Sequence, residues 1–282
     1  IATIVIPNGV ETISANAFAN TKLAEITIPN SVTTIGANAF AGTAIKTLVI
    51  PDNVTTLDVN AFKGMEYIEE IVLGAGITEI PAEMFKGLAT LKTVVIGKNV
   101  VSIGANAFAG TSITELNIPD SVTTLDANAF KGMILETITF GDGITEIPAS
   151  MFAGMTTVKN VTLGAKTTVI GTNAFANTSI ATIVIPTGVT TIGANAFAST
   201  LLTEIKIPST VTTIDATAFS GCALVTVDID GNNLVVPANM FKDVTTLTSV
   251  TFGNGVVEIG ASAFSGTSLI TVTIPNSVTK IG

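Results

Sequence analysis

A phenylalanine recurs through this chain at an almost constant spacing. Each of twelve phenylalanines follows the previous one by 22 or 23 residues. A fixed period in this range is typical of a solenoid, in which each repeat buries its apolar face against its neighbours. No linker or second kind of segment interrupts the series, so we predict a single array over residues 1–282. The twelve residues are Phe18, Phe40, Phe62, Phe85, Phe108, Phe130, Phe152, Phe175, Phe197, Phe219, Phe241 and Phe264.

An apolar pattern, L-x-x-I-x-I, accompanies the phenylalanines and occurs thirteen times when the copy that begins at Ile1 is counted. Its last three positions alternate between inward and outward and favour β-branched residues, which predicts a short strand with one buried side. Proline or glycine usually closes the pattern, as Pro29 does, and forces a turn. A second apolar pair, such as Val32 and Ile35, follows before the phenylalanine returns the chain to the interior.

The stretch LAEITIPNSVTTIGANAFAGT, residues 23–43, resembles the repeat of the BspA-like, or Treponema-type, class of leucine-rich repeat. The pattern of that class reads roughly LxxIxIPxxVxxIGxxAFxxC, and the resemblance covers the whole chain. It implies a β-rich α/β solenoid, a leucine-rich-repeat array of about 12 coils of 22–23 residues, with parallel strands on one face. The third position after the phenylalanine departs from the class pattern, because only Cys222 keeps the expected cysteine. Thr43 and Met65 stand there in other repeats, and such small or apolar residues predict a buried filler position.

The composition argues against catalysis and against binding of nucleic acid. The chain has no histidine, arginine, tryptophan or glutamine. Without histidine it lacks the commonest general base and the commonest neutral metal ligand. Without arginine it lacks the planar group that grips phosphate and reads guanine edges, and its net charge of −9 repels nucleic acid. We therefore expect no enzyme, no cofactor and no nucleic-acid partner.

Two sets of acidic residues are candidates for metal binding, and neither fits well. Asp58, Asp126 and Asp215 occupy one repeat position, but the first two lie three coils apart, or roughly 14 Å at about 4.8 Å per coil. The stretch DIDGNN offers Asp228, Asp230 and a following asparagine at alternate positions, in the manner of a calcium loop. A complete loop of this type needs a glutamate at its twelfth position, where this chain has asparagine. An irregular turn is the favoured interpretation, and no metal is assigned.

The outward positions of the predicted strands are the best candidate for a binding surface, because side chains vary there while the inward positions stay constant. Lys46, Glu69 and Lys92 fall at one position of three successive strands, where opposite neighbouring charges support the ladder. The side chains of the face are mostly small, and Tyr67 is the only tyrosine in the chain. The proposed surface consists of Glu25, Thr27, Thr47, Val49, Glu70, Val72, Thr93, Glu115, Thr137, Thr182 and Glu204.

The resemblance implies a secreted or cell-surface scaffold for protein interactions. BspA-like repeats are similar to modules of bacterial and protist surface proteins that mediate adhesion and bind host, matrix or neighbouring-cell proteins. The alternative is a structural stalk or fibre segment, or an engineered repeat array, without a specific ligand. No apolar run reaches the roughly 18 residues of a membrane span, so we expect no membrane insertion by this segment.

The two ends of the sequence lead to a further expectation. The chain opens within a strand motif, IATIVIP, and stops at SVTKIG, before the phenylalanine that would close the coil. Neither end shows the polar, atypical repeat that usually caps such an array. We therefore expect a fragment of a longer chain, without caps of its own, that associates end to end through exposed apolar surface.

Overall fold

The structure is a computed structural model that describes residues 3–282, so the Ile1 position of the first repeat lies outside the described residues. Two compact units divide the chain, Ile1–Gly143 and Ile144–Gly282. Each unit is a stack of coils, and between them they make about 13 turns of a β-solenoid with parallel strands. The described residues form strands and turns and contain no helix.

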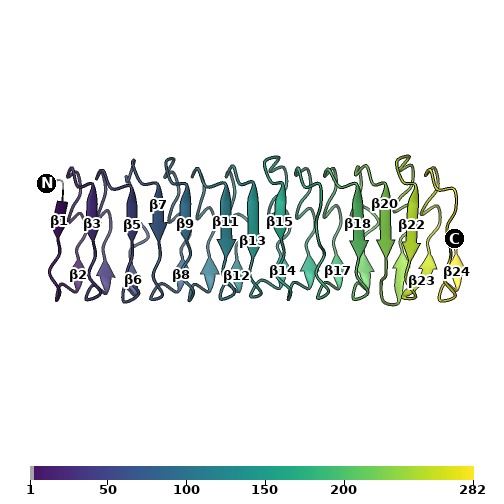
Figure 1. Ribbon diagram of the computed structural model, residues 1–282, viewed down its shortest axis with the longest axis horizontal. Coiled ribbons are helices and arrows are strands. Elements are labelled where there is room, and N and C mark those ends of the chain that lie inside the picture. The colour runs from purple at the N-terminus through teal and green to yellow at the C-terminus, as the bar shows by residue number, and fades with distance from the viewer. Residues whose placement is uncertain (1–2) are drawn as a thin grey trace. The chain divides into compact units, whose positions relative to one another are not determined.

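Most coils place the end of their L-x-x-I-x-I pattern in a strand of three or four residues, and these strands form a long-strand row in each unit (Figure 1). Inward and outward side chains alternate along these strands. In β5, for example, Leu48 points inward and is fully buried, whereas its neighbours Thr47 and Val49 are exposed. In unit 1 the row contains β1 (Thr3–Val5), β3 (Glu25–Thr27), β5 (Thr47–Val49), β7 (Glu70–Val72), β9 (Thr93–Val95), β11 (Glu115–Ile118) and β13 (Thr137–Phe140). In unit 2 it contains β15 (Asn160–Thr162), β18 (Glu204–Ile207), β20 (Thr226–Ile229) and β22 (Ser249–Phe252).

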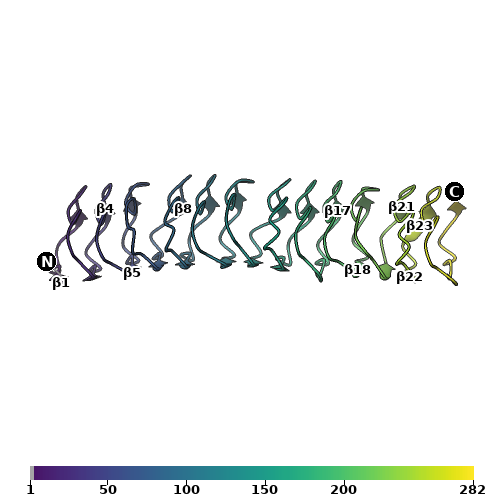
Figure 2. The same cartoon turned by 90° about the horizontal axis from the view of Figure 1, so that it is seen from above.

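A second row of mostly two-residue strands, the short-strand row, runs in the opposite direction on the other side of each unit (Figures 1 and 2). Its strands contain the second apolar residue of each repeat, as in the pairing of Ile13 with Ile35. Unit 1 contributes β2 (Thr12–Ile13), β4 (Thr34–Ile35), β6 (Thr56–Leu57), β8 (Glu79–Ile80), β10 (Ser102–Ile103) and β12 (Thr124–Leu125). Unit 2 contributes β14 (Glu146–Ile147), β16 (Val169–Ile170), β17 (Thr191–Ile192), β19 (Thr213–Ile214), β21 (Leu234–Val236), β23 (Val256–Ile259) and β24 (Lys280–Ile281).

The repeat phenylalanines close the third side of the core. In unit 2, Phe175, Phe197 and Phe219 stack at successive centroid separations of 5.4 Å. The turn that carries each ring needs left-handed backbone, as Asn38 (φ 53°) and Gly42 (φ 67°) show in one coil, and asparagine and glycine tolerate that conformation best. The recurrence of asparagine and glycine around the phenylalanine therefore follows from the geometry of the turn.

The structure confirms the predicted solenoid and its parallel strands. The return path between the long strands consists of turns and the short-strand row, so the described chain carries a second row of strands where an α/β solenoid would carry helices. The filler position after the phenylalanine is buried as predicted, because Thr43 and Met65 are fully buried and Cys222 is 5% exposed. That the two units continue one uninterrupted array stays a prediction.

We predict that Phe197→Ala lowers the free energy of unfolding by about 3–5 kcal/mol, because the fully buried ring loses contacts with a ring on each side. Chemical denaturation followed by circular dichroism measures this change. Phe18→Ala is the control and should cost less, since Phe18 is only half-buried. Equal denaturation midpoints for Phe197→Ala and the parent protein would contradict the stacked core.

Candidate interaction surface

The outward side chains of the long strands form columns in unit 1. One column contains Thr47, Glu70 and Thr93, which pair in register across β5, β7 and β9, and a second column two residues further along consists of valines. All predicted surface residues of this unit lie at such outward positions. Six of them are exposed, namely Glu25, Thr27, Thr47, Val49, Thr93 and Glu115, and three are half-buried, namely Glu70, Val72 and Thr137.

A row of alternating charges borders these columns. The Glu69 carboxylate lies 3.2 Å from the Lys46 ammonium and 2.8 Å from the Lys92 ammonium. Hydrogen bonds from Lys92 and Lys46, together with their charges, lower the pKa of the Glu69 carboxyl. The two lysines are exposed and Glu69 is partly exposed, so water screens their interaction and its contribution to stability is small. The predicted charge pairing across successive strands is confirmed for these residues.

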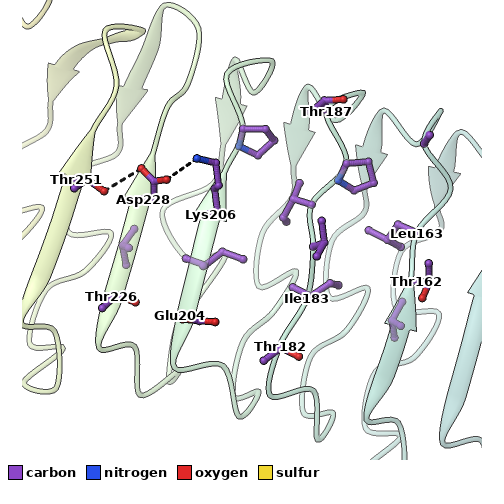
Figure 3. A pocket seen from close by; sticks show the side chains of 18 of the residues that line it. Thr162, Leu163, Thr182, Ile183, Thr187, Glu204, Lys206, Thr226, Asp228 and Thr251 are labelled. Atoms are coloured by element: carbon purple, nitrogen blue, oxygen red, sulfur yellow. Dashed lines mark hydrogen bonds and ion pairs between the residues drawn. The ribbon is translucent and has the colours of Figure 1, made fainter.

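A second charged group lies on the long strands of unit 2. The Lys206 ammonium is 2.7 Å from an Asp228 oxygen and 3.3 Å from an Asp230 oxygen, and the Thr251 hydroxyl donates to Asp228 at 2.9 Å (Figure 3). The hydrogen bond with Asp228, then that with Asp230, raises the pKa of Lys206. Burial acts to raise the pKa of Asp228, but the hydrogen bonds from Lys206 and Thr251 and the Lys206 charge outweigh it and lower that pKa.

This arrangement accounts for the carboxylates that resemble a calcium loop. Asp228 and Asp230 both face the Lys206 ammonium, so a lysine already provides the positive charge that a cation would bring. The chain then makes an irregular turn, with left-handed backbone at Gly231 and Asn233 and a register shift in the following strand pair. Within residues 3–282, no group of three or more histidine, cysteine, aspartate or glutamate side chains could hold a metal ion.

The other singled-out side chains have structural partners. Asp58, Asp126 and Asp215 each accept a hydrogen bond at 2.8 Å from the backbone N–H two residues later and so close a turn. The Cys222 thiol is buried against Phe197, and burial raises its pKa, which disfavours the reactive thiolate.

The long-strand row is interrupted at one coil inside unit 2. Residues 182–185 carry the repeat pattern, but they form no strand, and no backbone hydrogen bond in the described structure joins them to the coil on either side. The coils nevertheless remain stacked elsewhere, because β16, β17 and β19 pair without interruption and the phenylalanine stack continues. The interruption is therefore local to the long-strand row.

A threonine three residues after the repeat phenylalanine coincides with the interruptions of this row. In most of these coils its hydroxyl donates to the phenylalanine carbonyl, as Thr178 does to Phe175 at 2.8 Å. The next N–H, that of Ser179, then donates to Val158 of the preceding coil. Where strands pair, the donor is the N–H two positions later in the repeat, as in the bond from Glu69 to Lys46. Interruptions follow Thr43, Thr111, Thr178, Thr200 and Thr267, whereas strands pair across Met65, Leu88, Met133, Cys222 and Val244. Thr21, which lies between the paired β1 and β3, is the exception.

A groove of about 1030 Å³ lies over this interrupted part of unit 2. Its lining extends from β15 across residues 182–187 to β18, β20 and β22 (Figure 3). Two predicted surface residues, Thr182 and Glu204, belong to this lining. Val184 stands in the middle of the interrupted coil with 82% of its surface exposed, against 53% for Val49 at the same repeat position.

Sequence reasoning missed Val184, Lys206 and Asp228 as surface residues. A signal for the last two was present, since Lys206 and Asp228 occupy the same outward position of consecutive repeats and pair in register. The same alignment had identified Lys46 and Glu69.

No helix within residues 3–282 has the length and apolar character that a membrane crossing requires.

Comparison with known families gives one match along the chain. The model for the "BspA type Leucine rich repeat region (6 copies)" matches residues 1–112, 78–201 and 168–282. None of the curated proteins matches this sequence.

Several solved structures are similar to this chain. A leucine-rich repeat protein from Bacteroides ovatus is 22% identical, with a TM-score of 0.59 over 100% of this chain and 85% of its own. A leucine rich cell surface protein from Faecalibacterium prausnitzii is 24% identical, with a TM-score of 0.40 over 89% and 88% of the two chains. The Treponema pallidum leucine-rich repeat protein is 18% identical, with a TM-score of 0.41 over 58% and 73%.

The ion pair of Lys206 and Asp228 should make stability depend on pH in the acid range. Because the pKa of Asp228 is lowered by folding, its stabilisation is fully present above the ordinary aspartate pKa of about 3.9 and is lost as the pH falls through the lower folded value. Lys206→Met should therefore lower the Tm slightly at neutral pH, and this difference should disappear in strong acid. Melting curves across this pH range measure the effect. Lys242→Met, at another exposed lysine of unit 2, is the control, and a pH-independent effect of Lys206→Met would contradict the assignment.

Backbone amides in the interrupted coil should exchange quickly with solvent. Hydrogen–deuterium exchange should be at least about tenfold faster at residues 182–185 than in β20, which pairs on both sides. Equal protection of the two segments would show that the long-strand row is continuous there.

Proposed function

The chain belongs to the BspA-type leucine-rich repeat family, and on this premise we propose that it is a non-catalytic scaffold for protein interactions. Its ligand surface is the outward face of the long-strand rows. The predicted surface residues Thr47 and Glu204 belong to that face, one in each unit. The scaffold acts at the cell surface or outside the cell, where it binds host, matrix or neighbouring-cell proteins.

One observation carries this proposal. Inward side chains such as Leu48 and Ile71 are fully buried in the core, while the outward residues between them are held in register at the roughly 4.8 Å spacing of paired strands. Outward side chains can therefore change without altering the core, and a flat array of them presents many weak contacts at once. Such a surface gains affinity through multivalency rather than through a few deep anchors.

The charge of the protein supports a protein partner over nucleic acid. Its net charge of −9 repels a phosphate backbone. The surface location rests on the family, since repeats of this class resemble modules of surface proteins.

The alternative is a structural stalk or fibre segment, or an engineered array, that binds no ligand and self-associates end to end. The scarcity of tryptophan, tyrosine and arginine favours this alternative, because binding hot spots are rich in these three residue types. Tyr67 is the only residue of these three types in the chain. Light scattering over a concentration series detects such self-association.

We predict that substitution of the outward valine column weakens binding. The face variant is Val49→Lys, Val72→Lys and Val95→Lys combined, at positions in register on β5, β7 and β9. It should reduce capture by immobilised matrix glycoproteins, fibronectin among them, or by whole bacterial cells at least about tenfold, because lysine side chains block close contact.

The matched control carries the same number of lysines on the short-strand row. It combines Thr12→Lys, Thr34→Lys and Thr56→Lys, which are in register on β2, β4 and β6. This control should bind like the parent protein. Loss of binding in the control but not in the face variant would move the ligand surface to the short-strand row. Failure of the parent protein to bind any member of the panel would favour the stalk.

A further inference from the structure

The groove in unit 2 differs from the rest of the long-strand face in its backbone. Residues 182–185 are the only described interior coil of unit 2 whose long segment pairs with neither neighbour. Both flanking turns carry the threonine that accompanies an interruption. Thr178 donates to the Phe175 carbonyl, and Thr200 lies 3.2 Å from the Cys222 sulfur. The groove therefore exposes unpaired backbone N–H and C=O groups that the paired strands elsewhere do not offer.

Apolar side chains make up much of the lining. They come from four successive coils: Val184 is exposed, Val161 and Ile183 are half-buried, and Ile205 and Val227 are almost fully buried. Val184 is almost as exposed as a side chain at the end of a stack, with 82% of its surface accessible against 88% for Val5. An exposed β-branched side chain of this kind, in a groove that threonines also line, suits a partner that is itself partly apolar.

The charges of the lining favour a positively charged partner. The lining contains two carboxylates, Glu204 and Asp228, and one cation, Lys206, so its net charge is −1. The Lys206 ammonium is already engaged by Asp228 and by Asp230 beside the groove. Glu204 is exposed, and its carboxylate has no ion-pair or hydrogen-bond partner among residues 3–282. A carboxylate is thus available for a cation from outside, whereas the one lysine is not.

The extent of the groove indicates the size of the partner segment. The lining covers five coils, from β15 to β22, which corresponds to about 19 Å at roughly 4.8 Å per coil. An extended peptide covers about 3.3 Å per residue, so about six residues lie across these coils.

We propose that this groove binds an extended segment of a partner protein in which apolar and basic residues alternate. A lysine or arginine of the segment pairs with Glu204, and its apolar side chains cover Val184 and the half-buried Ile183. The inference rests on the proposed function, because it names the kind of partner segment that the strand face takes.

Fluorescence anisotropy with labelled peptides of about six residues tests the proposal. The probe alternates valine and lysine. One comparison peptide replaces lysine by glutamate, and another replaces valine by serine. The valine–lysine peptide should bind saturably, and both comparison peptides should bind at least about tenfold more weakly. Equal binding of the serine–lysine peptide would indicate non-specific charge attraction, and absence of saturable binding up to about 1 mM would overturn the proposal.

Charge reversal at Glu204 tests whether the peptide binds in the groove. Glu204→Lys should weaken binding of the valine–lysine peptide at least about tenfold, and Glu204→Gln should do so to a smaller extent. Glu25→Lys is the matched control, because Glu25 is also an exposed glutamate at the first position of a long strand, in unit 1. Circular dichroism is used to check that all three variants fold. Equal effects of Glu204→Lys and Glu25→Lys would place binding outside the groove and refute the proposal.

The same variants separate this inference from the proposed function. If Glu204→Lys leaves capture of a matrix or cell-surface partner unchanged while the valine-column variant abolishes it, the strand face binds protein but the groove is not the site. If no variant of the long-strand face alters capture, the proposed function itself fails.

Discussion

The face-to-face contact of one buried phenylalanine with the next is the interaction on which the remaining structure depends. In the stacked pairs, ring centroids lie between 5.3 Å, for Phe85 and Phe108, and 5.8 Å, for Phe18 and Phe40. These separations fall within the range preferred by offset aromatic rings. Because a stacked ring must lie over its predecessor, the chain can add or omit at most one residue between the coils that a stack joins. This restriction brings both strand rows of a unit into lateral register.

Because the core is fixed in this way, inward residues determine the packing and outward residues determine the surface. Inward positions of the long strands hold buried leucine, isoleucine and valine, whereas outward positions carry threonine, valine, glutamate and lysine. The interruption at residues 182–185 shows that one row can open while the other row and the phenylalanine stack stay closed. The surface of such a protein can therefore acquire a groove without loss of the core, which is a useful property in a binding scaffold.

The periodic part of this architecture was predictable from sequence. The phenylalanine spacing and the L-x-x-I-x-I pattern indicated the coils, the long strands and the outward surface, since Glu25 and Thr47 lie where the alternation placed them. The short-strand row was not predicted, because a two-residue strand such as β4 is too short to show a period and is defined by its neighbours. The interruptions were also missed. Thr43 and Met65 both fill the same buried position, and only the hydroxyl of the threonine bonds to a backbone carbonyl there.

The candidate site was predictable only in outline. Thr182 and Glu204 were identified as outward residues, but nothing in the repeat showed that the coil of Thr182 would stay unpaired. Asp228 and Asp230 suggested a calcium loop when the stretch DIDGNN was considered alone. Their partner, Lys206, lies 22 residues before Asp228 and meets it only because the coils stack. Interactions between coils are thus the part of the site that local sequence does not reveal.

The most direct test of the account is a saturation substitution scan of unit 2 read out by protease resistance. Inward positions such as Ile205 and Val227 are buried in the core, and their outward neighbours Lys206 and Thr226 are not. We predict that polar substitutions at the inward positions abolish protease resistance, while most substitutions at the outward positions preserve it. A similar loss of resistance at both kinds of position would contradict the claim that the stacked core alone fixes the fold and leaves the strand face free for binding.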